Sequence, residues 1–166
     1  MALSKTTKIV LVVGGIILIA GVGAYIYMNR PKPKKAEDNT DEVLGDVFDN
    51  LNFEFGKSDI KKDSYPYLDK LADTLNKAKN WTLEIQGHTD DKGGDDFNMK
   101  LSQGRADSVK NYLITKGVLL DSITAKGFGE SKPLVPNDSD ANRDKNRRVE
   151  FKITKPNNQV ITTIAQ

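Results

Sequence analysis

One arginine in this sequence falls on a helix face that is otherwise apolar. With about 100° of rotation per residue, the helix predicted to end at Lys116 places Arg105 near the middle of an apolar stripe. The stripe consists of Leu101, Ala106, Val109, Tyr112 and Leu113. A guanidinium in such surroundings needs an anion, because an unpaired buried charge is costly. We therefore take Arg105 as the first candidate for chemistry.

A polar pocket is predicted beside this arginine. Asn98 and Ser102 share its stripe toward the start of the helix, and the preceding Gly- and Asp-rich loop carries Asp90 and Asp91. In one interpretation Arg105 pairs with Asp90 and holds the loop, as half-buried arginines commonly do. In the other, the two residues form an amino-acid receptor. Arg105 would then bind a carboxylate through two parallel hydrogen bonds, and Asp90 would bind an ammonium group.

Composition argues against several other chemistries. The sequence has no cysteine and a single histidine, His88, which rules out disulfides, a thiol nucleophile and most zinc sites. A formal charge of only +2 provides no basic field for nucleic acid. Asp91, Asp95 and Asp96 lack the spacing and the bidentate glutamate of a calcium-binding loop. We expect no metal, no cofactor and no nucleic-acid partner.

The residue patterns predict an α+β domain. Alternation of apolar and polar residues predicts strands at 51–55, 81–86, 123–128 and 149–153. Helices are predicted from a cap at Ser64 to near Asn80, from the Gly- and Asp-rich loop to Lys116 with Gly117 as its C-cap, and near 140–145. The resulting order, βαβαβ(α)β, predicts a sandwich in which helices pack on one face of a mixed four-stranded sheet.

The N-terminal residues predict a membrane segment. Residues 9–28 include no charged side chain and match the roughly 20 residues that a helix needs to cross a bilayer. We divide the chain into a transmembrane signal anchor at 1–29, a charged linker at 30–46, a soluble domain at 47–155 and a C-terminal tail at 156–166. No ionisable residue lies within the span, which argues against a stator-type ion-channel subunit.

Short motifs extend along the whole soluble domain. They are Gly87-His88-Thr89-Asp90, Gly93, Asn98, Leu101-Ser102, Arg105-Ala106, Val109, Gly127-Phe128-Gly129-Glu130, Pro133 and Asn146-Arg147-Arg148-Val149-Glu150. In this order and spacing they resemble the signature of the OmpA-like peptidoglycan-binding family. The resemblance implies a βαβαβαβ fold that binds the peptide stem of peptidoglycan non-covalently. It also implies that meso-diaminopimelate sits between Asp90 and Arg105.

The resemblance implies further residues of the binding groove. They are Thr89 of the first motif, Asn98 and Leu101 beside the ligand, Phe55 and Gly56 at the end of the first strand, and Arg147 at the pocket floor. Gly56 would make contact through its backbone, since it has no side chain. A structural ion pair is the alternative for Arg147. His88 is expected to be a packed, hydrogen-bonded turn residue and not a ligand contact.

The expected function is to anchor a membrane protein, or an envelope-spanning complex, to the bacterial cell wall. We expect a single-pass inner-membrane protein with a periplasmic domain, although the basic residues after the span oppose this orientation. A cleaved signal peptide, leaving a periplasmic protein, is the alternative. The expected partners are peptidoglycan, the membrane and either a larger secretion or injection complex or a second copy. A wall-degrading enzyme is the rival from another class, and we predict no enzymatic activity.

Overall fold

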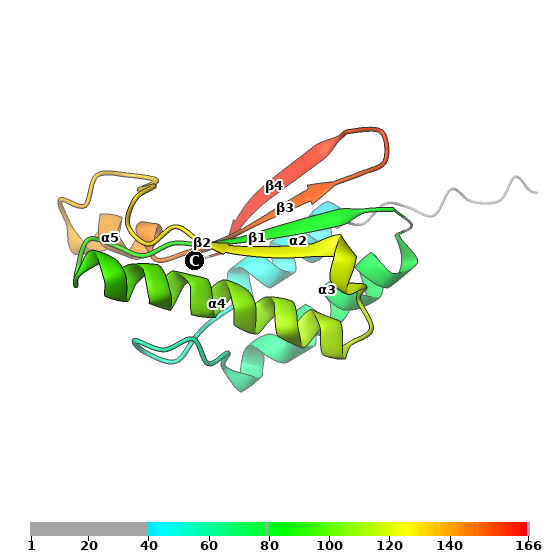
Figure 1. Cartoon of the computed structure of the whole chain (residues 1–166), viewed down its shortest axis with the longest axis horizontal. Coiled ribbons are helices and arrows are strands. Elements are labelled where there is room, and N and C mark those ends of the chain that lie inside the picture. The colour runs from blue at the N-terminus through cyan, green and yellow to red at the C-terminus, as the bar shows by residue number, and fades with distance from the viewer. Residues whose placement is uncertain (1–39, 79, 166) are drawn as a thin grey trace, which may run out of the picture. The chain divides into compact units, whose positions relative to one another are not determined.

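The computed structural model describes residues 40–78 and 80–165 (Figure 1). The predicted membrane segment and most of the predicted linker lie outside these residues. Within the two described ranges, no helix has both the length and the apolar character needed to cross a membrane.

The domain is built on a mixed four-stranded sheet with the strand order β2-β1-β3-β4. The strands are β1 (Thr82–Gly87), β2 (Ile123–Gly127), β3 (Val149–Thr154) and β4 (Val160–Ala165). Strand β1 runs parallel to β2 and antiparallel to β3, and β3 runs antiparallel to β4. Leu83 is paired with Ile123 on one side and with Ile153 on the other, so apolar residues point to the same face of the sheet.

Three longer helices lie along one side of the sheet (Figure 1). They are α2 (Thr40–Asn50), α3 (Tyr65–Lys77) and α4 (Asp95–Thr115). The remaining elements are the short helix α5 (Asp140–Asn146) and the single turns η1 (Lys62–Ser64) and η2 (Leu120–Ser122). Helix α4 packs on β1 and β2, and α2 packs on α3 and β4. The α+β class, the mixed sheet and the predicted helices are therefore confirmed.

The core fills the space between the sheet and these helices. Strands β1 and β3 contribute Leu83, Ile85, Phe151 and Ile153, all essentially without solvent exposure. The helices contribute Val43, Leu44, Val47, Leu68, Leu71, Ala72, Leu75, Ala106, Val109 and Leu113. The alternation of buried and less buried residues along β1 and β3 is the pattern from which these strands were predicted.

The strand predicted at 51–55 is wrong. The structure has only an isolated antiparallel bridge there, between Phe53 and Ile60. Leu51 is buried, but the side chain of Phe55 is fully exposed, so the segment leaves the domain surface after Phe53. It then turns back through a hydrogen bond from the Glu54 amide to the Asp59 carbonyl at 2.9 Å. The alternating pattern therefore reflects a short extended segment that ends in a turn.

The predicted linker and tail both overlap regular structure. Helix α2 begins at Thr40, inside the predicted linker, because Val43, Leu44 and Val47 form a buried apolar face. Strand β4, inside the predicted tail, supplies the fourth strand of the sheet in place of 51–55. It follows a tight turn at Asn158, whose φ of 59° is in the left-handed region that asparagine tolerates well.

Ser64 stands at the start of α3 but does not cap it with its side chain. Its hydroxyl instead donates to the Asn50 carbonyl at 2.7 Å and accepts from the Asn52 amide at 2.9 Å. The side chain therefore ties the end of α2 to the start of α3, which orients the segment that carries Phe53 and Phe55.

Candidate ligand-binding site

A cavity of about 600 Å³ lies between the 51–56 segment, the loop after β1, α4 and α5. Its lining residues are Leu51, Asn52, Phe53, Glu54, Phe55, Gly56, Thr89, Asp90, Lys92, Phe97, Asn98, Leu101, Arg105, Asp140, Asp144 and Arg147. Every residue predicted for the site is in this set. The structure therefore brings the predicted residues together, while their role in binding stays a prediction.

Close packing of α4 on the sheet positions Arg105. A Cβ added at Gly87 or Gly127 would overlap the backbone of Ser102 or Gln103, so glycine is needed at both strand ends. The Ser102 hydroxyl accepts a hydrogen bond from the Gly129 amide at 2.8 Å, and the Gln103 side chain accepts one from the Gly127 amide at 2.7 Å. These contacts fix the N-terminal half of α4 against the strand ends.

The guanidinium of Arg105 has few partners. Its Nε donates to the Lys57 carbonyl at 3.1 Å, and the group lies 5.3 Å from the centre of the Phe53 ring. Burial lowers the pKa of Arg105, as does the positive charge of Arg147, while the charge of Asp90 raises it. Within residues 40–78 and 80–165, neither Nη atom has a hydrogen-bond acceptor and no carboxylate forms an ion pair with this arginine.

Asp90 is instead paired with Arg147. Its Oδ2 accepts from Arg147 Nη1 at 2.6 Å, its Oδ1 accepts from the Lys92 amide at 3.1 Å, and its side chain is 9% exposed. Arg147 also pairs with Asp144. Burial lowers the pKa of Arg147, but the hydrogen bonds to Asp90 and Asp144 and the charges of these two carboxylates together raise it above its ordinary value. The ion pair proposed between Arg105 and Asp90 is therefore absent from the described residues.

Asn98 and Thr89 hold the loop after β1 in place. The Asn98 side-chain amide donates to Glu130 Oε2 at 2.6 Å and to the Asp90 carbonyl at 3.3 Å. The Thr89 amide donates to the Gly129 carbonyl at 2.9 Å, and its buried hydroxyl has no hydrogen-bond partner in the described part of the chain. The backbone that carries Asp90 is thus braced by the Gly129-Glu130 segment.

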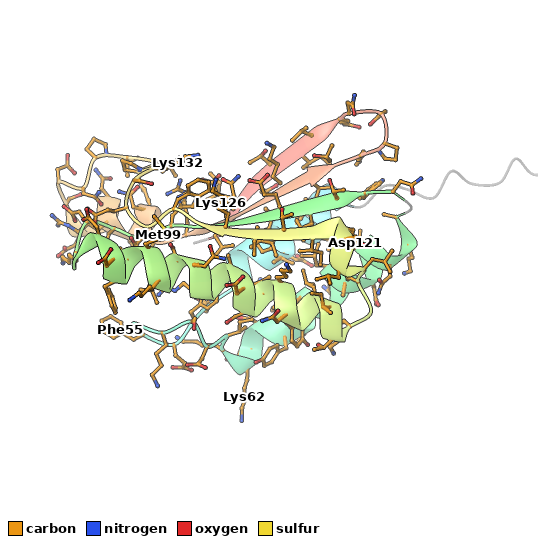
Figure 2. The ribbon with its side chains drawn as sticks, viewed as in Figure 1. Phe55, Lys62, Met99, Asp121, Lys126 and Lys132 are labelled. Carbon is orange, nitrogen blue, oxygen red and sulfur yellow. The ribbon has the colours of Figure 1, made fainter. Side chains whose placement is uncertain are left out.

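Phe55 and Gly56 lie in the turn after Phe53. Gly56 has a φ of 66°, which glycine adopts at no steric cost, and Phe55 projects from the domain (Figure 2). The carbonyl of the next residue, Lys57, accepts the hydrogen bond from Arg105, so the turn is attached to α4.

Sequence reasoning missed several lining residues. Asp140, Asp144 and Lys92 enter through α5 and the loop after β1, and Lys92 Nζ pairs with Asp140 at 3.0 Å. Phe97 lies on α4 and is 55% exposed. Its spacing of four residues from Leu101, and of eight from Arg105, was a usable signal, because such residues share one helix face.

His88 is packed beneath this loop and does not line the cavity. Its ring is buried and stacks on Phe128 at 5.3 Å, and neither ring nitrogen has a hydrogen-bond partner among the described residues. Burial lowers its pKa to about 4, and the positive charge of Arg148 acts in the same direction. His88 is packed as predicted, but its ring lacks the predicted hydrogen bonds. Within residues 40–78 and 80–165, no group of three or more acidic or histidine side chains could hold a metal ion.

The family that matches this chain is the OmpA family, over residues 52–147. Outer membrane porin F of Pseudomonas fluorescens is 44% identical over 104 residues, which are 63% of this chain and 32% of the porin. The chain thus spans about a third of that relative's length. The peptidoglycan-associated lipoprotein of Pasteurella multocida is 30% identical over 154 residues, which are 88% of this chain and 97% of the relative.

A solved structure with the same fold is the C-terminal domain of Helicobacter pylori MotB. It superposes with a TM-score of 0.59 at 32% sequence identity, covering 66% of this chain and 88% of that domain. The peptidoglycan-associated lipoprotein of Burkholderia pseudomallei has a TM-score of 0.56 at 24% identity, which supports the fold alone.

Proposed function

The chain belongs to the OmpA family, and we propose that its domain binds the peptide stems of peptidoglycan non-covalently. The ligand residue is meso-diaminopimelate, seated in the cavity between Arg105 and Asp90. Through this contact the domain anchors the protein, or a complex that contains it, to the cell wall.

The observation that carries the proposal is the state of Arg105. Its Nε is held by the Lys57 carbonyl, while both Nη atoms lack an acceptor among residues 40–78 and 80–165. A half-buried guanidinium with open donors, beside the like charge of Arg147, favours an incoming anion. A carboxylate suits it best, because two carboxylate oxygens match the planar pair of guanidinium donors.

Asp90 supplies the opposite charge for the same ligand. It lines the same cavity and lies close enough for its charge to act on the pKa of Arg105. Each of its oxygens already accepts one hydrogen bond, and a carboxylate has further lone pairs for an ammonium donor. The free end of diaminopimelate carries a carboxylate and an ammonium on one carbon, so it fits an arginine beside an aspartate.

The relatives support this proposal. The match to the peptidoglycan-associated lipoprotein of Pasteurella multocida covers almost its whole length, and that protein is named for its association with peptidoglycan.

We further propose that residues 9–28, outside the described part of the structure, place the protein in the inner membrane with the domain in the periplasm. The partner of the protein at the cell wall would then be a larger envelope complex or a second copy of this chain.

A wall-degrading enzyme is less well supported. Retaining and inverting glycosidases need two carboxyl groups, one of which keeps a proton for the leaving group. The cavity-lining aspartates Asp90, Asp140 and Asp144 are each paired with a cation. Glu54 is the one other carboxyl group of the lining, so the described residues offer no pair of carboxyl groups outside ion pairs at this cavity.

Sedimentation with purified sacculi tests the proposal. The full-length chain, kept in detergent, should sediment with sacculi, and free meso-diaminopimelate should release it in proportion to its concentration. 1,5-Diaminopentane at the same concentrations is the matched competitor, since it keeps the two ammonium groups of diaminopimelate but lacks both carboxylates and should release little. Equal release by both compounds, or no sedimentation at all, would contradict the diaminopimelate site.

A further inference from the structure

We propose that the cavity has a second part, formed by Phe97 and Phe55, that binds the amino sugar to which the peptide stem is attached. This inference rests on the proposed stem-binding function and adds to it the glycan end of the ligand. It starts from aromatic side chains that the diaminopimelate site does not use.

Both phenyl rings are exposed to solvent, although burying an apolar side chain would stabilise the folded protein. Phe55 is 100% exposed and Phe97 is 55% exposed, and both line the cavity. Large apolar side chains that are exposed together around a hollow commonly mark a binding surface. Neither ring belongs to the core described above.

The structure fixes the backbone that carries Phe55 and packs the ring of Phe97. The turn that carries Phe55 is closed by the hydrogen bond from the Glu54 amide to the Asp59 carbonyl, and Arg105 binds its Lys57 carbonyl. The ring of Phe97 lies against Gly93, where an added Cβ would be 3.4 Å from Cδ1 of the phenyl group. A packed ring such as that of Phe97 loses little conformational entropy when a ligand covers it.

Spacing along α4 connects this aromatic pair to the proposed stem site. Phe97, Leu101 and Arg105 are four residues apart on one face of α4, and all line the cavity. At about 1.5 Å of rise per residue, Phe97 lies about 12 Å from Arg105 along the helix axis. In a peptide stem the diaminopimelate is the third residue from the sugar, and three extended residues reach about 10 Å. A stem that runs from Arg105 along α4 toward its N-terminus therefore has its sugar within reach of Phe97.

The chemistry of a pyranose suits this place. One face of the ring presents C–H groups, which pack on an aromatic ring, while the hydroxyl groups at its edge stay in water. A cavity of about 600 Å³ is in the range of sites that take whole drug-sized ligands, so it has room for more than one amino-acid residue.

Calorimetry with two probes tests the inference on the full-length chain in detergent. One probe is the stem tripeptide that ends in meso-diaminopimelate, and the other is this tripeptide on N-acetylmuramic acid. The wild-type protein should bind the sugar-bearing probe about tenfold more tightly, and Phe97→Ala should remove most of this gain. The bare tripeptide should bind both proteins with the same Kd, and Phe97→Trp should keep the gain.

Met99→Ala is the matched control. Met99 is also an exposed apolar residue near the start of α4, but it does not line the cavity, and Figure 2 shows it on the other side of the helix from Phe55. The control should keep the full gain from the sugar. Equal affinity of the wild-type protein for the two probes would overturn the inference, as would an equal loss for both probes in Phe97→Ala. If neither probe binds, the proposed stem-binding function fails, and this inference fails with it.

Discussion

The two halves of α4 bury the same face of one helix but use it differently. In the C-terminal half, Val109 and Leu113 are buried against the sheet and the other helices. In the N-terminal half, Asn98 and Ser102 are equally buried but polar, and Arg105 lines the cavity. The two ends of one helix therefore have different roles. Apolar packing at one end holds the helix in place, and hydrogen bonds at the other end aim a charged group.

The apolar half should have the largest effect on stability. Replacing Leu113, which is fully buried, by alanine leaves a cavity and should lower the free energy of unfolding by about 2 to 5 kcal/mol. Urea denaturation measures this loss. The fraction that remains folded should still bind sacculi like the wild type. Loss of binding by well-folded Leu113→Ala protein would break the division between the two halves.

His88, in the loop that carries Asp90, should make the free energy of unfolding depend on pH. In the folded protein the pKa of His88 is about 4 instead of the ordinary 6.5, chiefly because its ring is buried. The unfolded chain therefore takes up a proton more readily, so stability is lost as the pH falls from about 6.5 to about 4. A pKa difference of about 2.5 corresponds to a loss on the order of 3 kcal/mol.

Urea denaturation at pH 7 and pH 4 measures this effect, with His88→Gln as the reference. The variant has no imidazole to protonate, so its loss of stability between the two pH values should be smaller. Parallel losses in both proteins would show that carboxylates, and not His88, dominate the acid sensitivity of this loop.

The polar half should have a smaller effect on stability. Ser102→Ala leaves the Gly129 amide without its acceptor at a fully buried place, which costs about 1 to 3 kcal/mol. Denaturation again measures the cost. Ser108→Ala is the matched control on the same helix, since Ser108 is less buried and should tolerate the change. Equal effects of the two substitutions would mean that the hydrogen bond to Gly129 does not fix the N-terminal half of α4.

The sequence predicted the elements that carry a regular pattern. Helix α3 and strands β1 and β3 show clear helical or alternating periodicity over their whole length, and each was found close to its predicted position. The positions of Asp90 and Arg105 in one cavity also followed from the helix geometry and the motifs. These features depend mainly on local sequence, or on motifs whose spacing is characteristic.

Other features depend on contacts between distant segments. Strand β4 forms by pairing with the edge of β3. Its own residues show little alternation of apolar and polar side chains by which it could be predicted. The partner of Asp90 is Arg147, which is 57 residues away, and the pair forms only because α5 and the loop after β1 meet. Helix α2 was not predicted, because its few apolar residues stand among acidic ones. Its apolar face is buried only through packing on α3 and β4. Pairings of this kind are set by tertiary structure.

The central claim, that Arg105 binds a ligand carboxylate through its open donors, is tested most directly by Arg105→Lys. Lysine keeps the charge but lacks the planar pair of donors. Sacculus binding and melting temperature should be measured on the same full-length preparations, with Lys100→Ala as a control that removes an exposed charge from α4 outside the cavity. Binding by Arg105→Lys should fall about tenfold or more, while stability falls by only about 1 kcal/mol through loss of the bond to Lys57. An Arg105→Lys protein that is destabilised but binds sacculi like the wild type would contradict the account.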